Sequence, residues 1–140
     1  MNHAMKLLLF YAYSFSFSTA EPGLPGLPPL ARTDRIEKTA VVFFHVEAED
    51  REKRAKVIQK FVKNTKWLAG KFETKNVVLH SFNHLSGSKA PPEFSREVLA
   101  AVRERLTRTG FTVLATPFGY FNEFSIHVAG DSLAKVFKEF

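Results

Sequence analysis

The stretch TAVVFFHVE, Thr39 to Glu47, is a continuous run of mostly β-branched and aromatic residues. Such a run has no polar face to turn toward water, so it predicts a strand that is buried on both faces of a sheet. Between Asp50, a suitable N-cap, and Gly70, apolar side chains recur at spacings of three and four, which predicts a helix. NVVLHSF, residues 76–82, predicts another strand. A buried strand, a helix and a further strand indicate an α/β fold.

The rest of the chain extends this pattern. Pro91 and Pro92 open a second helix, and Gly110 is its expected C-cap. Two strands are predicted at residues 111–115 and 120–130, and a last helix at residues 131–140. We therefore expect a single α/β domain over residues 1–140, with helices packed on a mixed sheet and a hairpin formed by the last two strands.

The N-terminal segment allows two interpretations. Aromatic residues at every second position from Tyr11 to Phe17 alternate with small residues, as in a half-buried strand. The apolar run before Ala20 also resembles a signal peptide, although it is too short to span a membrane as a helix. The strict alternation favours the strand. Residues 21–37 are rich in proline and glycine, and we interpret them as a connecting loop or flap.

Composition and charge narrow the function classes. The 140 residues include no cysteine, which excludes disulfides, thiolate chemistry and cysteine-ligated zinc. The formal net charge is +6, and residues 51–75 hold nine Lys or Arg against two acidic residues. Such a patch attracts polyanions, although a solvated helix face gives the same pattern. The chain has no phosphate-binding glycine loop and no nucleophile-elbow serine.

Two histidines flank the end of a predicted strand. His80 and His84 are four residues apart, which is about 13 Å along a strand and too far to share one metal ion. His84 follows the strand, at the place where ligands bind in many α/β proteins. A histidine there is more commonly a hydrogen-bonded structural residue, so both roles remain open.

The stretch ATPFGYFNEF, residues 115–124, combines a rigid turn with a polar side chain on an apolar strand face. Pro117 and Gly119 predict a turn whose backbone N–H groups are a candidate cradle for an anion or a carbonyl group. Asn122 is the single amide on the apolar face of the following strand, and a buried amide needs hydrogen-bond partners. It either caps the turn or points into a polar cavity.

Together, GFTVLATPFGYFNEFSI (residues 110–126) and SFNHLS (residues 81–86) resemble the archaeal-type N-terminal editing domain of threonyl-tRNA synthetase, a family similar in fold to the D-aminoacyl-tRNA deacylases. The likeness covers nearly the whole chain and is weakest in the Pro-rich loop and the basic helix. It implies a proofreading hydrolase that needs no metal or organic cofactor and removes serine from mischarged seryl-tRNA(Thr). It also implies that the chain is a tRNA-editing domain from a larger synthetase or editing protein.

The resemblance implies the partners and carries over Val46, Phe82, His84, Pro117, Phe118, Gly119 and Tyr120 as site residues. The other candidates come from this chain's own pattern. The catalytic candidates are Asn122 and His84. The substrate-binding candidates are Val46, Phe82, Asn83, Pro117, Phe118, Gly119, Tyr120 and Phe121. The candidates for contact with tRNA are Lys53, Lys56, Lys60 and Lys63. The implied partners are the acceptor end of tRNA(Thr) carrying serine, the remainder of the synthetase and a second copy in a homodimer, in the cytoplasm and away from membranes.

Three positions depart from the family pattern. Members often have a lysine where this chain has Asn122, a tyrosine where it has Phe121, and a glutamate in the last helix where it has Lys135. A lysine–glutamate pair therefore cannot position water here. One interpretation is that the ribose hydroxyl beside the ester orients the water, while backbone N–H groups hold the oxyanion. The alternative is a non-catalytic module that binds tRNA or docks to a synthetase.

Overall fold

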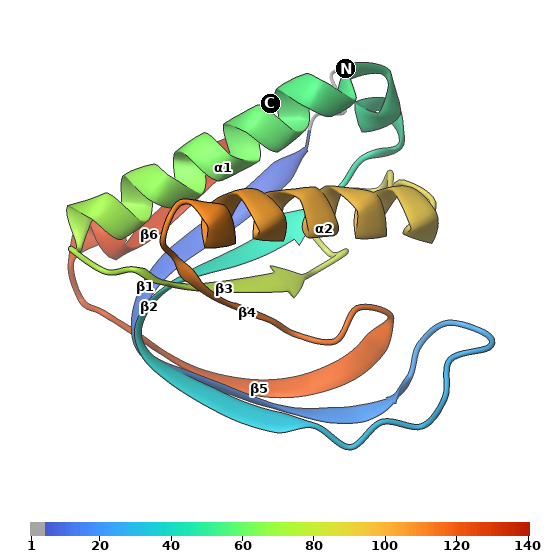
Figure 1. Cartoon of the computed structure of the whole chain (residues 1–140), viewed down its shortest axis with the longest axis horizontal. Coiled ribbons are helices and arrows are strands. Elements are labelled where there is room, and N and C mark those ends of the chain that lie inside the picture. Colours follow the sequence, from blue (N-terminus) through green and yellow to red (C-terminus); the bar gives the residue numbers. More distant parts are fainter. Residues whose placement is uncertain (1–4) are drawn as a thin grey trace.

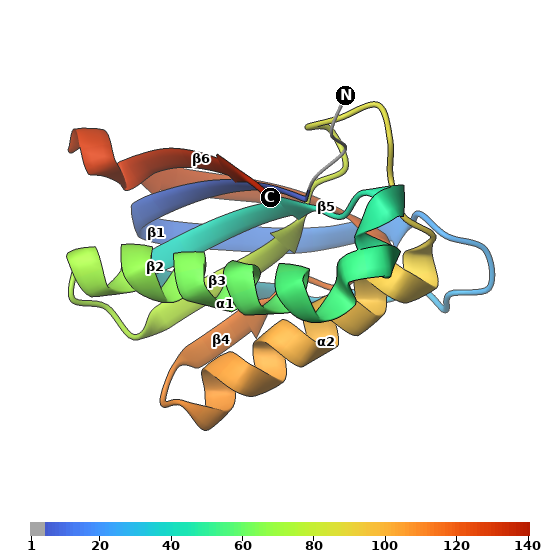
Figure 2. The ribbon, with the colours of Figure 1, turned by 90° about the horizontal axis from the view of Figure 1, so that it is seen from above.

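Two long helices cover one face of a mixed sheet (Figures 1 and 2). The computed structural model describes residues 5–140. Along the chain the elements are β1 (Lys6–Pro22), β2 (Thr33–His45), the 3-10 helix η1 (Ala48–Lys53), α1 (Arg54–Lys71), β3 (Asn76–Ser81), α2 (Pro92–Arg108), β4 (Thr112–Ala115), β5 (Tyr120–Val128), the 3-10 helix η2 (Ser132–Ala134) and β6 (Lys135–Glu139). The predicted α/β domain, with helices packed on a mixed sheet, is confirmed.

Strand directions explain why the sheet is mixed. β2, β3 and β4 are parallel to one another, and β1 is antiparallel to β2. The other edge of β1 pairs with two strands in turn, β6 along residues 6–10 and β5 along residues 12–22. The resulting strand order is β4-β3-β2-β1-β5, with β6 also on β1.

The predicted hairpin between the strands at residues 111–115 and 120–130 is wrong, because the observed strands β4 and β5 lie on opposite edges of the sheet. In a flat sheet these edges would be about 19 Å apart. The backbone from Ala115 to Tyr120 reaches about 18 Å when fully extended, and Gly119, at φ +85°, makes it turn. The sheet must therefore curl until its edges approach each other. Figure 1 shows β5 lying below β4 together with the curved second halves of β1 and β2, and the short connection from β4 turns back into β5.

Apolar side chains pack on both faces of the sheet. Residues 39–45 of β2 are all buried, as expected of a central strand. On the helix side Phe44 packs against Phe61 of α1, with ring centroids 5.4 Å apart. On the opposite face Phe15 and Phe43 belong to a second cluster. Among residues 5–140 no helix has the length and apolar character needed to cross a membrane.

The N-terminal strand is confirmed, but its single apolar face is not. Phe15 is buried, whereas Tyr13 is 49% exposed. The pairing of β1 with β5 shifts between Ala12 and Ser14. An irregularity of this kind moves the following side chains to the other face of the sheet. The Pro-rich loop predicted at residues 21–37 is also shorter, residues 23–32, because residues 33–37 belong to β2.

The predicted beginning of the first helix needs correction. Asp50 is not the N-cap of α1, because it lies inside the preceding 3-10 helix η1. Its carboxylate accepts a hydrogen bond from the backbone N–H of Glu47 at 2.7 Å. α1 begins only at Arg54. The second helix is as predicted, but its C-cap is Thr109, and Gly110, at φ +97°, is the residue after the cap.

The predicted C-terminal helix at residues 131–140 is wrong. This segment forms η2 and then β6, which pairs antiparallel with the first half of β1. β5 pairs with the second half of β1 only, so the first half would otherwise present unpaired backbone groups. Pairing with this edge outweighs the local helical pattern of the segment.

The closing turn gives a direct test of the curl. Replacing Gly119 with Ala should lower the free energy of unfolding by about 2 kcal/mol, since the position has a positive φ and the end of the Leu27 side chain must move away from a new Cβ that would lie 2.8 Å from its Cδ1. Gly26 is the matched control: its φ is +82°, but a Cβ added there would have no atom within 4 Å. Gly26→Ala should cost about 1 kcal/mol. Equal losses in urea unfolding would contradict a packed closure at Gly119.

Candidate functional site

A cavity of about 320 Å³ lies where the two edges of the curled sheet approach each other. Its lining comes from the start of the Pro-rich loop (23–24), from residues between 81 and 90 after β3, from the first turn of α2, and from residues 116–122. The carboxyl ends of β3 and β4 lead into it, which is the usual position of ligand sites in α/β sheets.

Asn122 fastens the turn between β4 and β5. Its Nδ2 donates to the carbonyl oxygens of Pro117 and Tyr120, both at 3.2 Å, and its Oδ1 accepts from Thr19 Oγ1 at 2.9 Å. Both amide donors and the acceptor are therefore used within the protein. Of the two roles considered for Asn122, this geometry supports the capping of the turn.

The Pro-rich loop packs on the same turn and forms one wall of the cavity. The N–H of Gly23 donates to the carbonyl of Gly119 at 2.7 Å, and the hydroxyl of Tyr120 donates to the carbonyl of Pro28 at 2.7 Å. Leu24 lies against Gly119 and also lines the cavity. The loop is thus part of the site rather than a plain connection.

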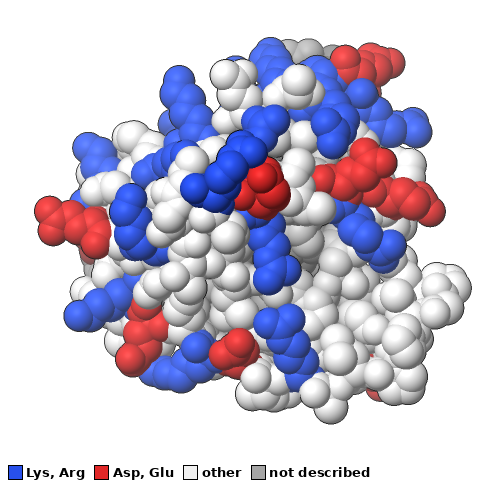
Figure 3. Space-filling model, viewed as in Figure 1, with Lys and Arg blue, Asp and Glu red and all other residues white. Residues whose placement is uncertain are grey.

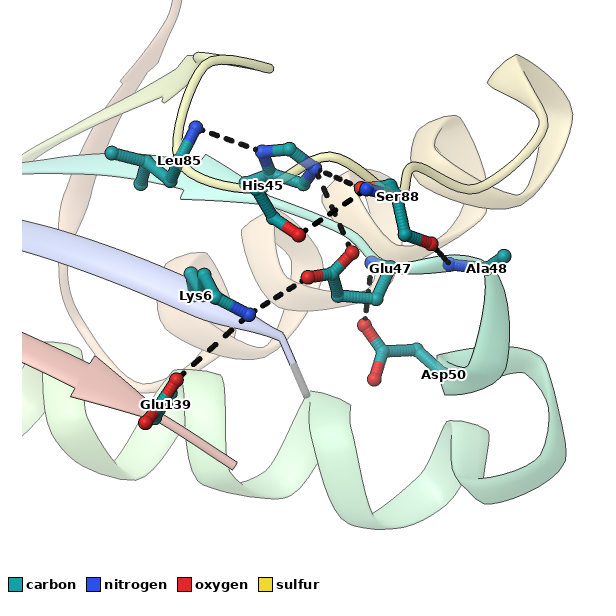
Figure 4. Close-up of polar contacts among 9 residues, drawn as sticks. Lys6, His45, Glu47, Ala48, Asp50, Leu85, Ser88 and Glu139 are labelled. Atoms are coloured by element: carbon teal, nitrogen blue, oxygen red, sulfur yellow. Dashed lines mark hydrogen bonds and ion pairs between the residues drawn. The ribbon is translucent and has the colours of Figure 1, made fainter. Parts of the chain in front are cut away.

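The opposite wall, residues 84–89, is held by the imidazole of His45 (Figure 4). This side chain is fully buried. Its Nδ1 accepts the backbone N–H of Leu85 at 3.1 Å, so its proton is on Nε2, which donates to the carbonyl of Ser88 at 2.5 Å. A neutral imidazole therefore bridges two backbone groups of the wall.

Beneath this wall Lys6 forms ion pairs with two carboxylates. Lys6 Nζ lies 2.8 Å from Glu47 Oε1, which is fully buried, and 3.8 Å from Glu139 Oε2 (Figure 4). Burial raises the pKa of Glu47, but the hydrogen bonds of Lys6 and Ser86, together with the charge of Lys6, outweigh it and hold this pKa below its ordinary value. Burial raises the pKa of Asp50, although the N–H of Glu47 opposes this effect. The network connects the beginning of β1 to the end of β2.

His80 supports the floor of the cavity from below. Its Nδ1 is 2.9 Å from Oγ1 of Thr116, which lines the cavity, and its ring lies among phenylalanines that include Phe43, at 5.0 Å between centroids. Burial lowers the pKa of His80 from 6.5 to about 4, so the ring is neutral near pH 7. Within residues 5–140 no group of three or more His, Cys, Asp or Glu is arranged to hold a metal ion.

The structure brings most of the predicted site residues together. Asn83, His84, Pro117, Phe118, Gly119, Tyr120, Phe121 and Asn122 all line the cavity. Val46 is instead buried in the core, and its carbonyl accepts the N–H of Ala90 at 2.9 Å. Phe82 packs on Phe43 with centroids 5.0 Å apart. Lys135 is not beside the cavity, because it begins β6 and its Nζ donates to the carbonyl of Ala129 at 3.0 Å.

The predicted tRNA-contacting lysines do not reach the cavity. Lys53 ends η1, and Lys56, Lys60 and Lys63 belong to α1, no residue of which lines the cavity. Figure 3 shows Lys and Arg spread over the helix side, whereas the lower right, where Figure 1 places the Pro-rich loop and the β4–β5 turn, carries few charges. Lining residues that the sequence did not indicate include Lys89 and Ser95. Lys89 lies between a predicted buried strand and the next predicted helix, and this position indicates a residue near the ligand site.

Comparison with known proteins gives one consistent result. The profile of a family described as the archaea-specific editing domain of threonyl-tRNA synthetase matches residues 5–140. Threonine–tRNA ligases of Thermococcus onnurineus and Methanoregula boonei are 31% and 30% identical over 135 and 134 residues. These alignments cover 94% and 96% of this chain but 22% of each ligase, so the chain spans about a fifth of these relatives.

A solved structure also shares the fold. The chain aligns with a protein named c-Myc DNA Unwinding Element Binding Protein at a TM-score of 0.66 and 14% identity, over 96% of this chain and 97% of that one. At this identity the likeness concerns the arrangement of helices and strands alone.

Loss of the His45 bridge should loosen one cavity wall. In His45→Ala the N–H of Leu85 and the carbonyl of Ser88 lose their partners, and the cost should be about 2–4 kcal/mol of unfolding free energy. Hydrogen exchange at the amide of Leu85 should become at least tenfold faster. His84→Ala is the control, because His84 is exposed and makes neither contact. Unchanged protection at Leu85 in His45→Ala would contradict this account.

Acid should destabilise the protein through His80. The unfolded chain binds a proton below pH 6.5, while the folded protein resists protonation until about pH 4. The free energy of unfolding should therefore fall by about 3 kcal/mol from this group as the pH decreases from 6.5 to 4. In His80→Gln this part of the slope should disappear from urea titrations across that range. A slope that persists in the variant would assign the pH dependence to other groups.

Proposed function

The chain belongs to the family of archaea-specific editing domains of threonyl-tRNA synthetase, and on that premise we propose that it hydrolyses the ester of seryl-tRNA(Thr). The observation that carries the proposal is the cavity, most of whose lining comes from the two motifs of the family resemblance, residues 81–86 and 110–126. The proposed partners are the acceptor end of the tRNA and the remainder of a longer synthetase, in the cytoplasm. A homodimer stays a prediction.

The need for hydrolysis follows from the size of the substrates. Serine lacks one methyl group of threonine, and a missing methyl changes binding by only about 1–3 kcal/mol. A synthetase that selects by binding alone would therefore attach serine to tRNA(Thr) at an appreciable rate. A second site that hydrolyses the seryl ester corrects this error.

The cavity suits a terminal nucleoside and its seryl group. Its volume, about 320 Å³, lies at the lower end of the range for small-ligand sites. Phe121 is 64% exposed at its edge and offers a ring on which a base can stack. Within residues 5–140 the backbone N–H groups of Phe118 and Gly119 donate no hydrogen bond. They are available for the carbonyl oxygen of the ester.

The proposed reaction uses few side chains. A water molecule attacks the ester carbon, the N–H groups of Phe118 and Gly119 stabilise the oxyanion, and the bond to the ribose oxygen then breaks, leaving serine and a free hydroxyl on the tRNA. The neighbouring ribose hydroxyl orients the water and relays its proton. His84, which is exposed in the cavity, also holds this water. Asn122 contributes by holding the turn that carries the N–H groups.

An ester-hydrolysis assay tests this proposal. With seryl-tRNA(Thr) the protein should accelerate the release of serine, and threonyl-tRNA(Thr) should react more slowly. Asn122→Ala should slow release by about threefold to tenfold, because the turn is weakened rather than removed. A substrate that lacks the terminal 2′-hydroxyl should react roughly 100-fold to 10,000-fold more slowly.

Each part of the assay can fail separately. No acceleration for the seryl ester, together with intact tRNA binding, would identify a non-catalytic binding module instead. A larger loss from Asn122→Ala than from removal of the ribose hydroxyl would overturn the ribose-assisted mechanism and assign the chemistry to the amide.

A further inference from the structure

A nucleic acid that fills the cavity with its terminal nucleoside must leave its phosphates outside. The cavity, at about 320 Å³, has room for one small ligand. The phosphate on the 5′ side of the terminal nucleoside therefore lies at the rim. Phosphate contacts position a nucleic acid, so the cations at the rim indicate its path.

Two cations lie near the beginning of α2, one in the lining of the cavity and one beside a lining residue. Lys89 is exposed and lines the cavity, and within residues 5–140 it forms no hydrogen bond or ion pair. The guanidinium carbon of Arg96 lies 5.4 Å from the ring centre of Phe118, which also lines the cavity. Arg96 likewise makes no ion pair among the described residues. Both charges are thus available to a ligand.

Ser95 adds a buried donor between these two cations in the sequence. The residue is 4% exposed and lines the cavity, and its hydroxyl has no hydrogen-bond partner within residues 5–140. It belongs to the first turn of α2, whose N-terminus favours negative charge. Glu93 in the same turn opposes this effect, whereas the charge of Glu97 is matched by Arg54 at 3.6 Å.

The other side of the rim carries no charge. Residues 23–31 of the Pro-rich loop contain no Lys, Arg, Asp or Glu, and Figure 3 shows an uncharged surface in that area. A phosphate that left the cavity over this loop would lose water without gaining a cation. The rim therefore has a cationic side at α2 and an apolar side at the loop.

We propose that Lys89, Arg96 and the hydroxyl of Ser95 form a binding site for the phosphate that precedes the terminal nucleoside, and that the RNA leaves the cavity over the first turns of α2. The site rests on the proposed function, since it assumes a nucleic-acid 3′ end in the cavity. Lys89 acts as a point charge, and the planar guanidinium of Arg96 can contact two phosphate oxygens. The path differs from the one along the lysines of α1.

Paired substrates test this site. The double variant Lys89→Ala/Arg96→Ala should raise KM for seryl-tRNA(Thr) by about 10-fold to 100-fold and leave kcat within threefold. For the seryl ester of free adenosine, which has no phosphate, KM should stay within twofold of the unaltered protein. The slope of log KM against log salt should decrease by about 0.7 for each phosphate that the variant no longer binds. The matched control is Arg108→Ala/Lys138→Ala, which removes two charges away from the cavity.

The outcomes separate this site from the proposed function. If the unaltered protein hydrolyses neither ester, the proposed function fails. The phosphate site is then tested by the binding of a short single-stranded RNA that has the 3′ end of the tRNA, measured by fluorescence anisotropy. Weaker RNA binding by the Lys89/Arg96 variant supports the site, and unchanged binding overturns it. Equal changes in KM for both esters, or a larger change from Lys56→Ala/Lys60→Ala on α1, would also overturn it.

Discussion

The connection between β4 and β5 is too short to cross a flat sheet, and the shape of the molecule follows from this constraint. Only residues 116–119 separate two strands that lie on opposite edges. The sheet curls to bring these edges together, and the turn at Gly119 completes the approach. Because the connection closes the curl at the carboxyl ends of the parallel strands, the cavity forms where the chain has to turn. Architecture and candidate site share one cause.

The walls of this cavity are held mainly through backbone groups. Asn122 binds the carbonyls of Pro117 and Tyr120, His45 bridges Leu85 and Ser88, and Gly23 binds Gly119. Each of these contacts positions peptide groups rather than a reactive side chain. A site built in this way can recognise the shape and the hydrogen-bonding pattern of a ligand. It offers few acidic or basic side chains for catalysis. The charged network of Lys6 and Glu47 stays beneath the wall and stabilises it.

The sequence predicts most elements because their patterns are local. The buried run at Thr39 and the spacing of apolar residues in the two long helices reflect burial, which acts residue by residue. The wrong predictions concern partners that are distant in the chain. No local pattern shows that residues 135–139 complete an edge of β1, or that β4 and β5 lie far apart in the strand order. The motif residues 117–122 were predicted as a group, but the hydrogen-bonding role of Asn122 depends on Thr19, which is remote in sequence.

The placement of positive charge shows what the sequence and the fold each contribute. The sequence places its densest positive charge at residues 51–75, which drew attention to the lysines of α1. In the fold, α2 rather than α1 adjoins the cavity, so the isolated cations Lys89 and Arg96 are better placed than the dense patch. Local charge density raises the rate of encounter with a polyanion, but a few groups at the rim decide how its end enters. The lysines of α1 can thus attract the same nucleic acid without contacting the part that reacts.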